Sequence, residues 1–254
     1  MATYKKRGYK PKSKEEEQDL ESRKSTTAEV FSTLDESASR SEQWVSRNQN
    51  YILGAIGVIA VVVLGYLAYN QFIQDPREES AANELYYPQQ YFEQALNATA
   101  KDSLFNLALT GAEGKYGFLD IIEEYSGTKA ANLANYSAGM AYLNMQQYEQ
   151  AIKYLENFSS DDAMLGALAK GGIGDAFMQL GQPGEALTYY EQAFKHSNND
   201  FTTPKFLYKA GITAVELDMN DKALTYFRRI KEEYPKAAEA GTIDVFIGMA
   251  QKGV

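Results

Sequence analysis

The longest apolar stretch of the chain lies between Arg47 and Asp75, a window that contains no Asp, Glu, Lys, Arg or His. Within it, residues 51–73 read YILGAIGVIAVVVLGYLAYNQFI. As a helix these residues would reach about 35 Å, which is enough to cross a hydrocarbon layer about 30 Å thick. A buried core helix would be shorter and would carry a polar stripe, and a cleaved signal peptide would lie nearer the N-terminus. The pattern therefore predicts one uncleaved transmembrane helix over residues 49–74.

Charged residues are distributed unequally on the two sides of this stretch. Residues 1–49 hold ten Lys or Arg and nine Asp or Glu, whereas residues 75–254 hold fifteen and twenty-five. The six basic residues of the segment 1–14 are accompanied by no acid. Because basic residues stay on the cytoplasmic side of a span, residues 1–48 are predicted to form a cytoplasmic arm. This arm has few apolar residues and is expected to be largely disordered.

Beyond residue 130 the apolar positions follow a helical period, and the pattern recurs after 35 and 37 residues. Each unit has a glycine, an alanine twelve residues later and a large apolar residue sixteen residues later: Gly139, Ala151 and Leu155; Gly174, Ala186 and Tyr190; Gly211, Ala223 and Phe227. Small residues at these offsets allow two antiparallel helices to approach closely. A period near 34 with this arrangement is the signature of the tetratricopeptide repeat.

The predicted fold is all-α, with an N-terminal single transmembrane helix followed by a tetratricopeptide-type helical repeat solenoid. Helices of the repeats are expected at 130–144, 148–158, 163–180, 184–196, 203–218 and 220–233. The predicted parts are the arm 1–48, the span 49–74, a linker helix 75–100 and a repeat domain 101–254. Within the repeat domain we expect a degenerate unit 102–130, units near 132–165, 167–200 and 204–237, and a capping helix 237–251.

Composition excludes several classes of chemistry. The chain has no cysteine, which rules out structural disulfides, thiolate zinc sites and cysteine nucleophiles. The acidic C-terminal part offers no basic surface to nucleic acid. The one histidine, His196, is expected to be solvated at a helix end, and the paired acids at 123–124 and 161–162 are expected on polar faces or turns. We therefore expect a chain that is not an enzyme, without cofactor, metal or small-molecule substrate.

The predicted partner-binding surface is the concave face formed by the first helices of the units. Aligning the units on their glycines places nine residues there: Tyr136, Met140, Asn144, Asp175, Met178, Gln179, Tyr208, Ile212 and Glu216. Leu143 and Val215 share this face, and packing between units accounts equally well for several of these positions. The face lacks the Lys, Asn and Arg set that would grip a C-terminal carboxylate. It suits an extended or helical protein segment better.

The order of the parts resembles the YfgM family of bacterial inner-membrane proteins. The resemblance covers most of residues 45–254 and rests on the span at 51–73, the stretch IIEEY at 121–125, Leu133, Ala134, Gly139, Tyr142, Tyr148 and Ala151. It implies a single-pass protein of the bacterial inner membrane with a periplasmic repeat domain. It also implies an ancillary role at the Sec translocon, with SecYEG and a periplasmic chaperone such as PpiD as partners. The long N-terminal arm and the 19 tyrosines depart from the family pattern.

A second interpretation stays open. The ending Glu-Tyr-Pro-Lys-Ala at 233–237 is shared with periplasmic repeat proteins that coordinate outer-membrane or cell-wall machinery. The alternative function is therefore a cell-envelope scaffold with the same topology. The two interpretations differ in the proteins that should accompany the chain after mild detergent extraction.

Overall fold

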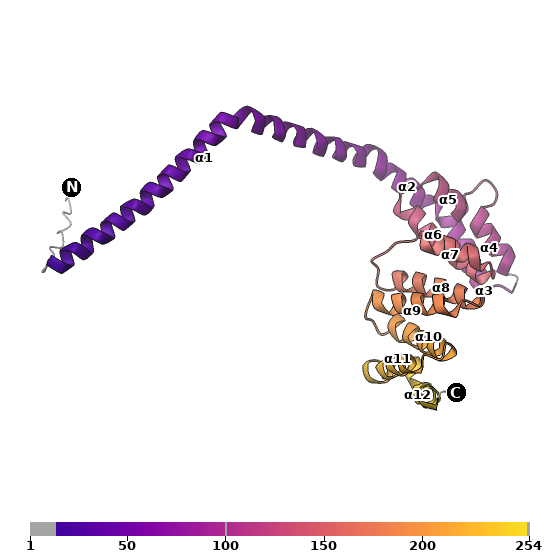
Figure 1. Cartoon of the computed structure of the whole chain (residues 1–254). Coiled ribbons are helices and arrows are strands. Elements are labelled where there is room, and N and C mark those ends of the chain that lie inside the picture. Colours follow the sequence, from indigo (N-terminus) through magenta and orange to yellow (C-terminus); the bar gives the residue numbers. More distant parts are fainter. Residues whose placement is uncertain (1–13, 100, 253–254) are drawn as a thin grey trace, which may run out of the picture. The chain divides into compact units, whose positions relative to one another are not determined.

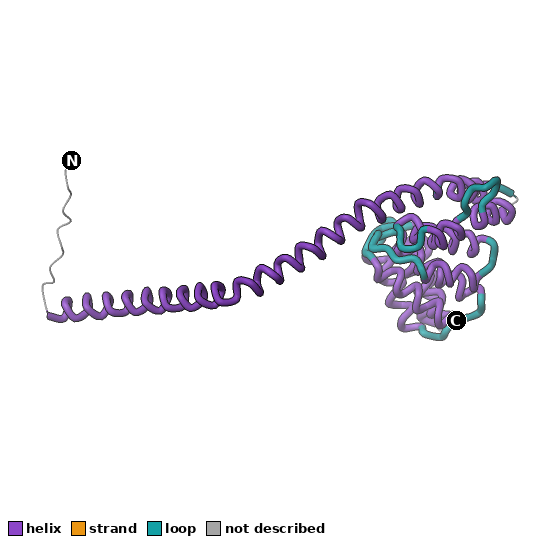
Figure 2. The backbone as a smooth tube through the Cα atoms, turned by 90° about the horizontal axis from the view of Figure 1, so that it is seen from above, coloured by secondary structure: helices purple, strands orange, loops and turns teal. Residues whose placement is uncertain are grey.

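The computed structural model describes residues 14–99 and 101–252. The chain divides into two units between Tyr69 and Asn70, and each unit is described by itself (Figure 1). Within the described residues the backbone forms helices and turns, with a single isolated backbone bridge in one loop (Figure 2). The predicted all-α fold class is therefore confirmed.

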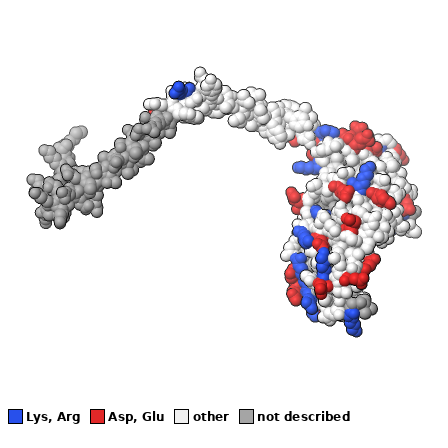
Figure 3. All heavy atoms as spheres, in the orientation of Figure 1, with Lys and Arg blue, Asp and Glu red and all other residues white. Residues whose placement is uncertain are grey.

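The first unit is one helix, α1 (Lys14–Tyr69), whose second half carries the apolar stretch. The side chains of this half are uncovered: Val61 is 70% exposed and Leu64 is 65% exposed. Figure 3 shows the same half free of charged atoms. Its most apolar 18-residue window has a mean hydropathy of 2.4, and α1 contains the one helix segment among the described residues that is long and apolar enough to span a membrane. Length and composition thus meet the requirements for a span.

Helix α1 begins at Lys14, within the arm for which composition predicts disorder. Residues 14–24 consist mostly of Lys, Glu, Gln, Arg and Leu, which have high helix propensity and account for a helical backbone there. Residues 1–13 lie outside the described residues. The disorder predicted for them stays a prediction.

The second unit begins with elements that differ from the predicted linker helix 75–100. A π-helical turn, η1 (Asn70–Gln74), is followed by α2 (Asp75–Glu84), α3 (Tyr86–Asn97) and α4 (Lys101–Thr110). Helix α3 packs chiefly against α4 rather than acting as a linker. Leu85, Ala95 and Phe105 are buried in one core because they project from the facing sides of these helices. The segment is thus part of the folded domain.

The predicted degenerate unit 102–130 is also arranged differently. Helix α4 makes fewer contacts with α5 (Phe118–Glu124) than with α3, and α5 packs mainly on α6 (Lys129–Asn144). Helix α5 has only seven residues, so it covers little of a longer neighbour. The first helical pair of the domain is therefore α3 with α4.

Two adjacent charged residues of α2 hold the ends of two other helices. The Arg77 guanidinium donates a hydrogen bond to the carbonyl of Glu124 at the C-terminal end of α5, at 2.8 Å. The Glu78 carboxylate accepts hydrogen bonds from the backbone N–H groups of Lys129 and Ala130 at the start of α6, at 2.9 and 3.2 Å. Each charge is opposite in sign to the helix end that it meets, so both contacts are favourable.

The repeats consist of three helical pairs. They are α6 with α7 (Tyr148–Glu156), α8 (Leu165–Gln179) with α9 (Pro183–His196), and α10 (Thr202–Glu216) with α11 (Asn220–Glu233). Figure 1 shows the pairs stacked in chain order, and neighbouring helices pack along the whole series. All six helices agree with the sequence prediction to within two residues at every end.

The glycine of each pair lies at the crossing of its two helices. A methyl group on Gly139, Gly174 or Gly211 would come within 3 Å of the side chain sixteen residues later, which is Leu155, Tyr190 and Phe227 respectively. The alanines Ala151, Ala186 and Ala223 are fully buried. The predicted close approach of the paired helices is therefore present in all three units.

The array ends with a 3-10 turn, η2 (Ala238–Thr242), and α12 (Ile243–Lys252), where the sequence predicts one capping helix over 237–251. Helix α12 packs on α11. The Phe246 ring contacts the rings of Tyr208 and Phe227, with centroids 5.1 and 5.7 Å apart. This contact covers apolar surface that the last repeat would otherwise expose.

Polar contacts recur between the second helices of successive units. The Tyr189 hydroxyl donates to Glu156 at 2.7 Å, and the Tyr226 hydroxyl donates to Glu191 at 2.7 Å. Glu191 also accepts hydrogen bonds from the ammonium groups of Lys222 and Lys195, each at 3.0 Å. Burial by itself would raise the pKa of Glu191, but these three hydrogen bonds lower it to about 2.

We predict opposite effects for two Gly→Ala substitutions within helices. Gly174→Ala places a methyl group against the Tyr190 ring, and the strain should destabilise the fold by about 1–3 kcal/mol. The control Gly248→Ala, in α12, adds a methyl group where no atom lies within 4 Å, and improved helix propensity should leave stability unchanged or raise it by up to about 1 kcal/mol. Urea unfolding of the full chain in mild detergent, followed by circular dichroism, measures both. Equal effects of the two substitutions would contradict the crossing geometry.

A second prediction concerns how the stability of the fold depends on pH. The pKa of Glu191 is lower in the folded chain than its ordinary value of 4.5, so the stability that it contributes is present above pH 4.5 and is lost as the pH falls toward 2. Glu191→Gln should therefore destabilise the chain by about 1–3 kcal/mol at pH 7, and the difference from the unsubstituted chain should shrink between pH 5 and pH 2. Glu149→Gln, at an exposed position of α7, is the matched control and should show no such convergence.

Candidate functional site

A groove of about 550 Å³ runs across the first helices of the three units. Its lining comes from α6, α8 and α10, with contributions from the turn after α6, the start of α7, and α9. The lining residues are Leu143, Asn144, Gln146, Tyr148, Asp175, Met178, Gln179, Tyr190 and Lys209. Four of the nine residues predicted to bind a partner therefore line this groove, and its walls are mostly polar.

Residues at equivalent positions of the three units form rows along this face. The row Asn144, Gln179 and Glu216 ends each first helix, and all three side chains are exposed. Two amides followed by a carboxylate thus face solvent at intervals of one repeat. The Tyr148 hydroxyl lies 3.4 Å from the Gln179 side-chain oxygen, which is long for a hydrogen bond, so both groups keep bonding capacity for a partner.

A second row is apolar and holds neighbouring units together. Met178 and Val215 are half-buried and pack against the core of α8 to α12, and the Thr213 hydroxyl lies 3.7 Å from the Met178 sulfur. Leu143 is half-buried beside Gly172 of the next unit. Packing between units is therefore the structural role of this row, and of the three only Leu143 and Met178 also reach the groove.

The predicted residues Tyr136, Met140, Tyr208 and Ile212 lie in packed surroundings. The Tyr136 ring contacts Phe158 with centroids 5.2 Å apart, and its burial raises the pKa of its hydroxyl. Met140 packs in the cluster around Ile173. Tyr208 contacts α12, and Ile212 joins the same core. Helical alignment places these residues on the first helices, but packing covers them: Met140 contacts the next unit, Tyr136 contacts Phe158 of its own unit, and Tyr208 contacts α12.

One charged pair lies in the middle of the groove. The Lys209 ammonium contacts both carboxylate oxygens of Asp175, at 2.5 and 2.7 Å, and the Tyr190 hydroxyl donates to the same carboxylate at 2.7 Å. Burial raises the pKa of Tyr190, and the Asp175 charge and hydrogen bond raise it further. The pair joins α8 to α10 and leaves the groove without an excess of either charge at this point.

Sequence reasoning did not identify several groove residues. Lys209 occupies the position equivalent to Ser137 and Gly172, so no repeated pattern marks it. The repeat pattern marks Tyr190 only as the large residue of the helix crossing, yet Tyr190 also lines the groove. The one signal for Lys209 in the sequence is its place directly after Tyr208, a predicted partner-binding residue.

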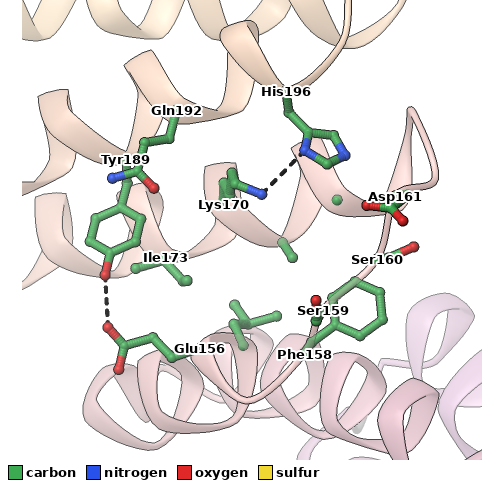
Figure 4. A pocket seen from close by; sticks show the side chains of 13 residues that line it. Glu156, Phe158, Ser159, Ser160, Asp161, Lys170, Ile173, Tyr189, Gln192 and His196 are labelled. Carbon is green, nitrogen blue, oxygen red and sulfur yellow. Dashed lines mark hydrogen bonds between the residues drawn. The ribbon is translucent and has the colours of Figure 1, made fainter. Parts of the chain in front are cut away.

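A separate hollow of about 530 Å³ lies between the end of α7, the loop 157–164, the first half of α8, and α9. Figure 4 shows that Lys170 and His196 meet at one end of it and Glu156 and Tyr189 at the other. Ile173 lines this hollow, whereas Asp175, two residues later, lines the groove, so the two cavities lie on opposite sides of α8. The sequence analysis predicts that His196 is solvated at a helix end. It is half-buried, because its ring packs against Gly166, where a side chain would collide with it.

Comparison with protein families gives one match. Residues 136–200 and 172–238 each match the tetratricopeptide repeat, and together the two segments include most of α6 and all of α7 to α11. No curated protein matches the chain. The paired helices, the glycine crossings and the groove agree with this match. The chain therefore contains tetratricopeptide repeats, a class of repeat that generally serves as a non-enzymatic scaffold for protein interaction.

Proposed function

We propose that this protein is a membrane-anchored scaffold that holds a protein segment in the groove of its repeats. The observation that carries the proposal is the combination of one uncharged apolar helix with a groove built from three successive repeats. The apolar stretch ends within η1, and α2 follows it directly in the chain. A weak contact in the groove then becomes effectively intramolecular for any partner in the same membrane, at a local concentration of about millimolar.

The proposed orientation has residues 1–48 in the cytoplasm and residues 75–254 in the periplasm of a bacterial inner membrane. The six basic residues in the segment 1–14 support it. On the other side of the span, Arg77 is the only basic residue before Lys101, among five acids. The second unit is acidic as a whole, so nucleic acid is not among the proposed partners.

The chemistry of the groove favours a protein segment over a charged small molecule. Asn144, Gln146 and Gln179 offer neutral donors and acceptors at the rim, and Asp175 is already paired with Lys209. Leu143 and Met178 add apolar surface between them. Such a surface fits an extended or helical segment, whose main chain needs hydrogen bonds and whose side chains need apolar contacts. The scaffold is proposed to be non-catalytic and to need no cofactor or metal.

At a finer level we place the scaffold beside the Sec translocon. The resemblance to the YfgM family, in the order of arm, span and degenerate repeats, supports this placement. In that setting the span would contact SecYEG laterally, and the repeats would hold a PpiD-like chaperone or an emerging chain. Gly54, Gly57 and Gly65 in the span offer small surfaces for helix contact, since a methyl group on any of them would have no side chain of the described residues within 4 Å.

The topology predicts the result of a protease experiment. With one epitope tag at each end of the chain, protease added to intact spheroplasts should remove the C-terminal tag and leave a protected fragment that carries the N-terminal tag. The reason is that residues 75–254 would be accessible and residues 1–48 would not. Immunoblotting of both tags measures the outcome, with a cytoplasmic protein as the control for sealed membranes. Survival of the C-terminal tag in sealed spheroplasts would contradict the orientation.

If the groove binds a partner, filling it with a large side chain should reduce the amount of partner that co-purifies with the chain. Asn144→Trp and Gln179→Trp each place a large ring at an exposed position of the groove, where folding should tolerate it. Gln150→Trp, at an exposed position of α7 outside the groove lining, is the matched control. Quantitative mass spectrometry after mild extraction should find SecYEG and a PpiD-like chaperone with the unsubstituted chain and the control. The chaperone should fall about tenfold or more with the groove variants.

Two results would change the proposal. Equal recovery of partners by the groove variants and the control would move the binding surface elsewhere. Recovery of outer-membrane assembly or cell-wall proteins in place of Sec subunits would favour the alternative function, a cell-envelope scaffold.

A further inference from the structure

The hollow behind α8 contains a lysine whose charge has no protein counter-ion among the described residues. Lys170 projects from α8 into the hollow and is half-buried. The ion pairs of the described part of the chain involve other lysines and Arg229, and none includes Lys170. Because a partly buried cation loses hydration, it is normally compensated by a nearby anion. Here that anion is missing from the described chain.

Among the described residues, the Lys170 ammonium makes its one polar contact with His196. The two nitrogens, Nζ of Lys170 and Nδ1 of His196, lie 3.3 Å apart (Figure 4). The other ring nitrogen, Nε2, lies 3.0 Å from the carbonyl oxygen of Asp162, which can only accept a hydrogen bond. Nε2 therefore carries the ring hydrogen, and Nδ1 accepts from the ammonium. This contact therefore brings no negative charge next to Lys170.

The carboxylates near the hollow are engaged elsewhere or lie at its rim. Glu156, at the far end, accepts the hydrogen bond from Tyr189; burial of that tyrosine, together with this contact, raises its pKa to about 12. Asp162 accepts from the backbone N–H groups of Met164 and Leu165, which lower its pKa. Asp161 is exposed on the loop. Glu156 and Asp161 also line the hollow, and Lys170 is the one lysine or arginine in its lining, at the end where it meets His196.

The hollow is held in shape by its loop and has an apolar floor. Asn132 of α6 exchanges two hydrogen bonds with the backbone of Ser159, at 2.8 and 3.0 Å. The Ser197 hydroxyl donates to the carbonyl of Ala163 at 2.7 Å, so the loop is fixed at both of its ends. Leu155 and Ile173 form the floor between the charged end and the Glu156 end. Ser159, Ser160 and Gln192 supply neutral polar groups in the lining.

We propose that this hollow binds a carboxylate attached to a short apolar group, as at the C-terminus of a protein chain that ends in an aliphatic residue. The carboxylate lies at the Lys170 and His196 end, where it accepts a charge-assisted hydrogen bond from the ammonium. The aliphatic side chain lies on Leu155 and Ile173. Ser159, Ser160 and Gln192 bond to the amide that precedes the carboxylate.

This site is independent of the groove. It lies on the opposite side of α8, and its lining shares no residue with the groove. The chain would therefore offer two binding sites of different chemistry, one for a segment and one for a chain end. Failure of the groove experiment leaves this site untouched, and the reverse also holds.

The test uses a matched pair of probes that differ in one charge, N-acetyl-leucine and N-acetyl-leucinamide. Saturation-transfer difference NMR on the full chain in detergent micelles, with empty micelles as the blank, gives a dissociation constant for each probe. We expect the acid to bind at least tenfold more tightly than the amide. The strongest transfer should be to the leucine methyl groups, because they lie on the apolar floor.

Two lysine variants test whether the preference for the acid depends on the charge of Lys170. Lys170→Met removes the ammonium and keeps a side chain of similar length, and it should abolish the preference for the acid. Lys153→Met, at an exposed position of α7 outside the lining, removes the same charge and should leave the preference unchanged. Equal binding of acid and amide by the unsubstituted chain would overturn the proposal. So would an equal loss of preference in both variants, or the absence of any transfer at millimolar probe.

Two further probes identify the source of the carboxylate. A longer peptide, acetyl-Ala-Ala-Leu, and a small acid, 4-methylpentanoate, share the carboxylate and the branched apolar group. Tighter binding of the peptide supports a protein C-terminus. Equal binding of the small acid supports a free carboxylic acid as the ligand of the same site.

Discussion

The contact between a glycine of one helix and a large side chain of its partner sets the geometry of the repeat domain. At Gly139, Gly174 and Gly211 the backbone is bare where Leu155, Tyr190 and Phe227 press against it. The bare backbone brings the two helix axes close, and the large residue fills the space beside them. Since the same contact occurs once in each unit, the two helices of all three pairs cross at equivalent positions. The groove lies across the first helices of these pairs.

Contacts between units follow from the same regularity. Tyr189 with Glu156 and Tyr226 with Glu191 join second helices at separations of 33 and 35 residues. On the other side, Lys209 and Asp175 join first helices at a separation of 34. The second helices thus meet through polar contacts at both junctions, the first helices of the last two units meet through Lys209 and Asp175, and an apolar layer lies between these surfaces. The polar contacts lie at the surface, where they fix the register of neighbouring units, while burial of the apolar layer supplies most of the stability.

Sequence predicted the repeats well and the ends of the domain poorly, for physical reasons. The offset from glycine to large residue is a packing requirement, so it appears in the sequence and fixes six helices. The pairing of α3 with α4 leaves no such mark, because Leu85, Ala95 and Phe105 are spaced like any amphipathic helix. Periodicity places a residue on a face of its helix but does not say whether other residues cover it, and Tyr136 and Tyr208 are covered by Phe158 and by Phe246. Lys170 and His196 lie on the paired helices α8 and α9, but no repeated pattern in the sequence marks their contact.

The side chains of Arg77 and Glu78 favour one direction of α2 relative to α5 and α6. A positive and a negative charge, adjacent in the chain, meet the negative end of α5 and the positive end of α6. If α2 were turned end for end, each charge would face a helix end of its own sign. Only one of the two opposite directions of α2 is therefore electrostatically favourable. Two neighbouring residues thus encode a direction, which apolar packing by Ala81 and Leu85 alone would leave unspecified.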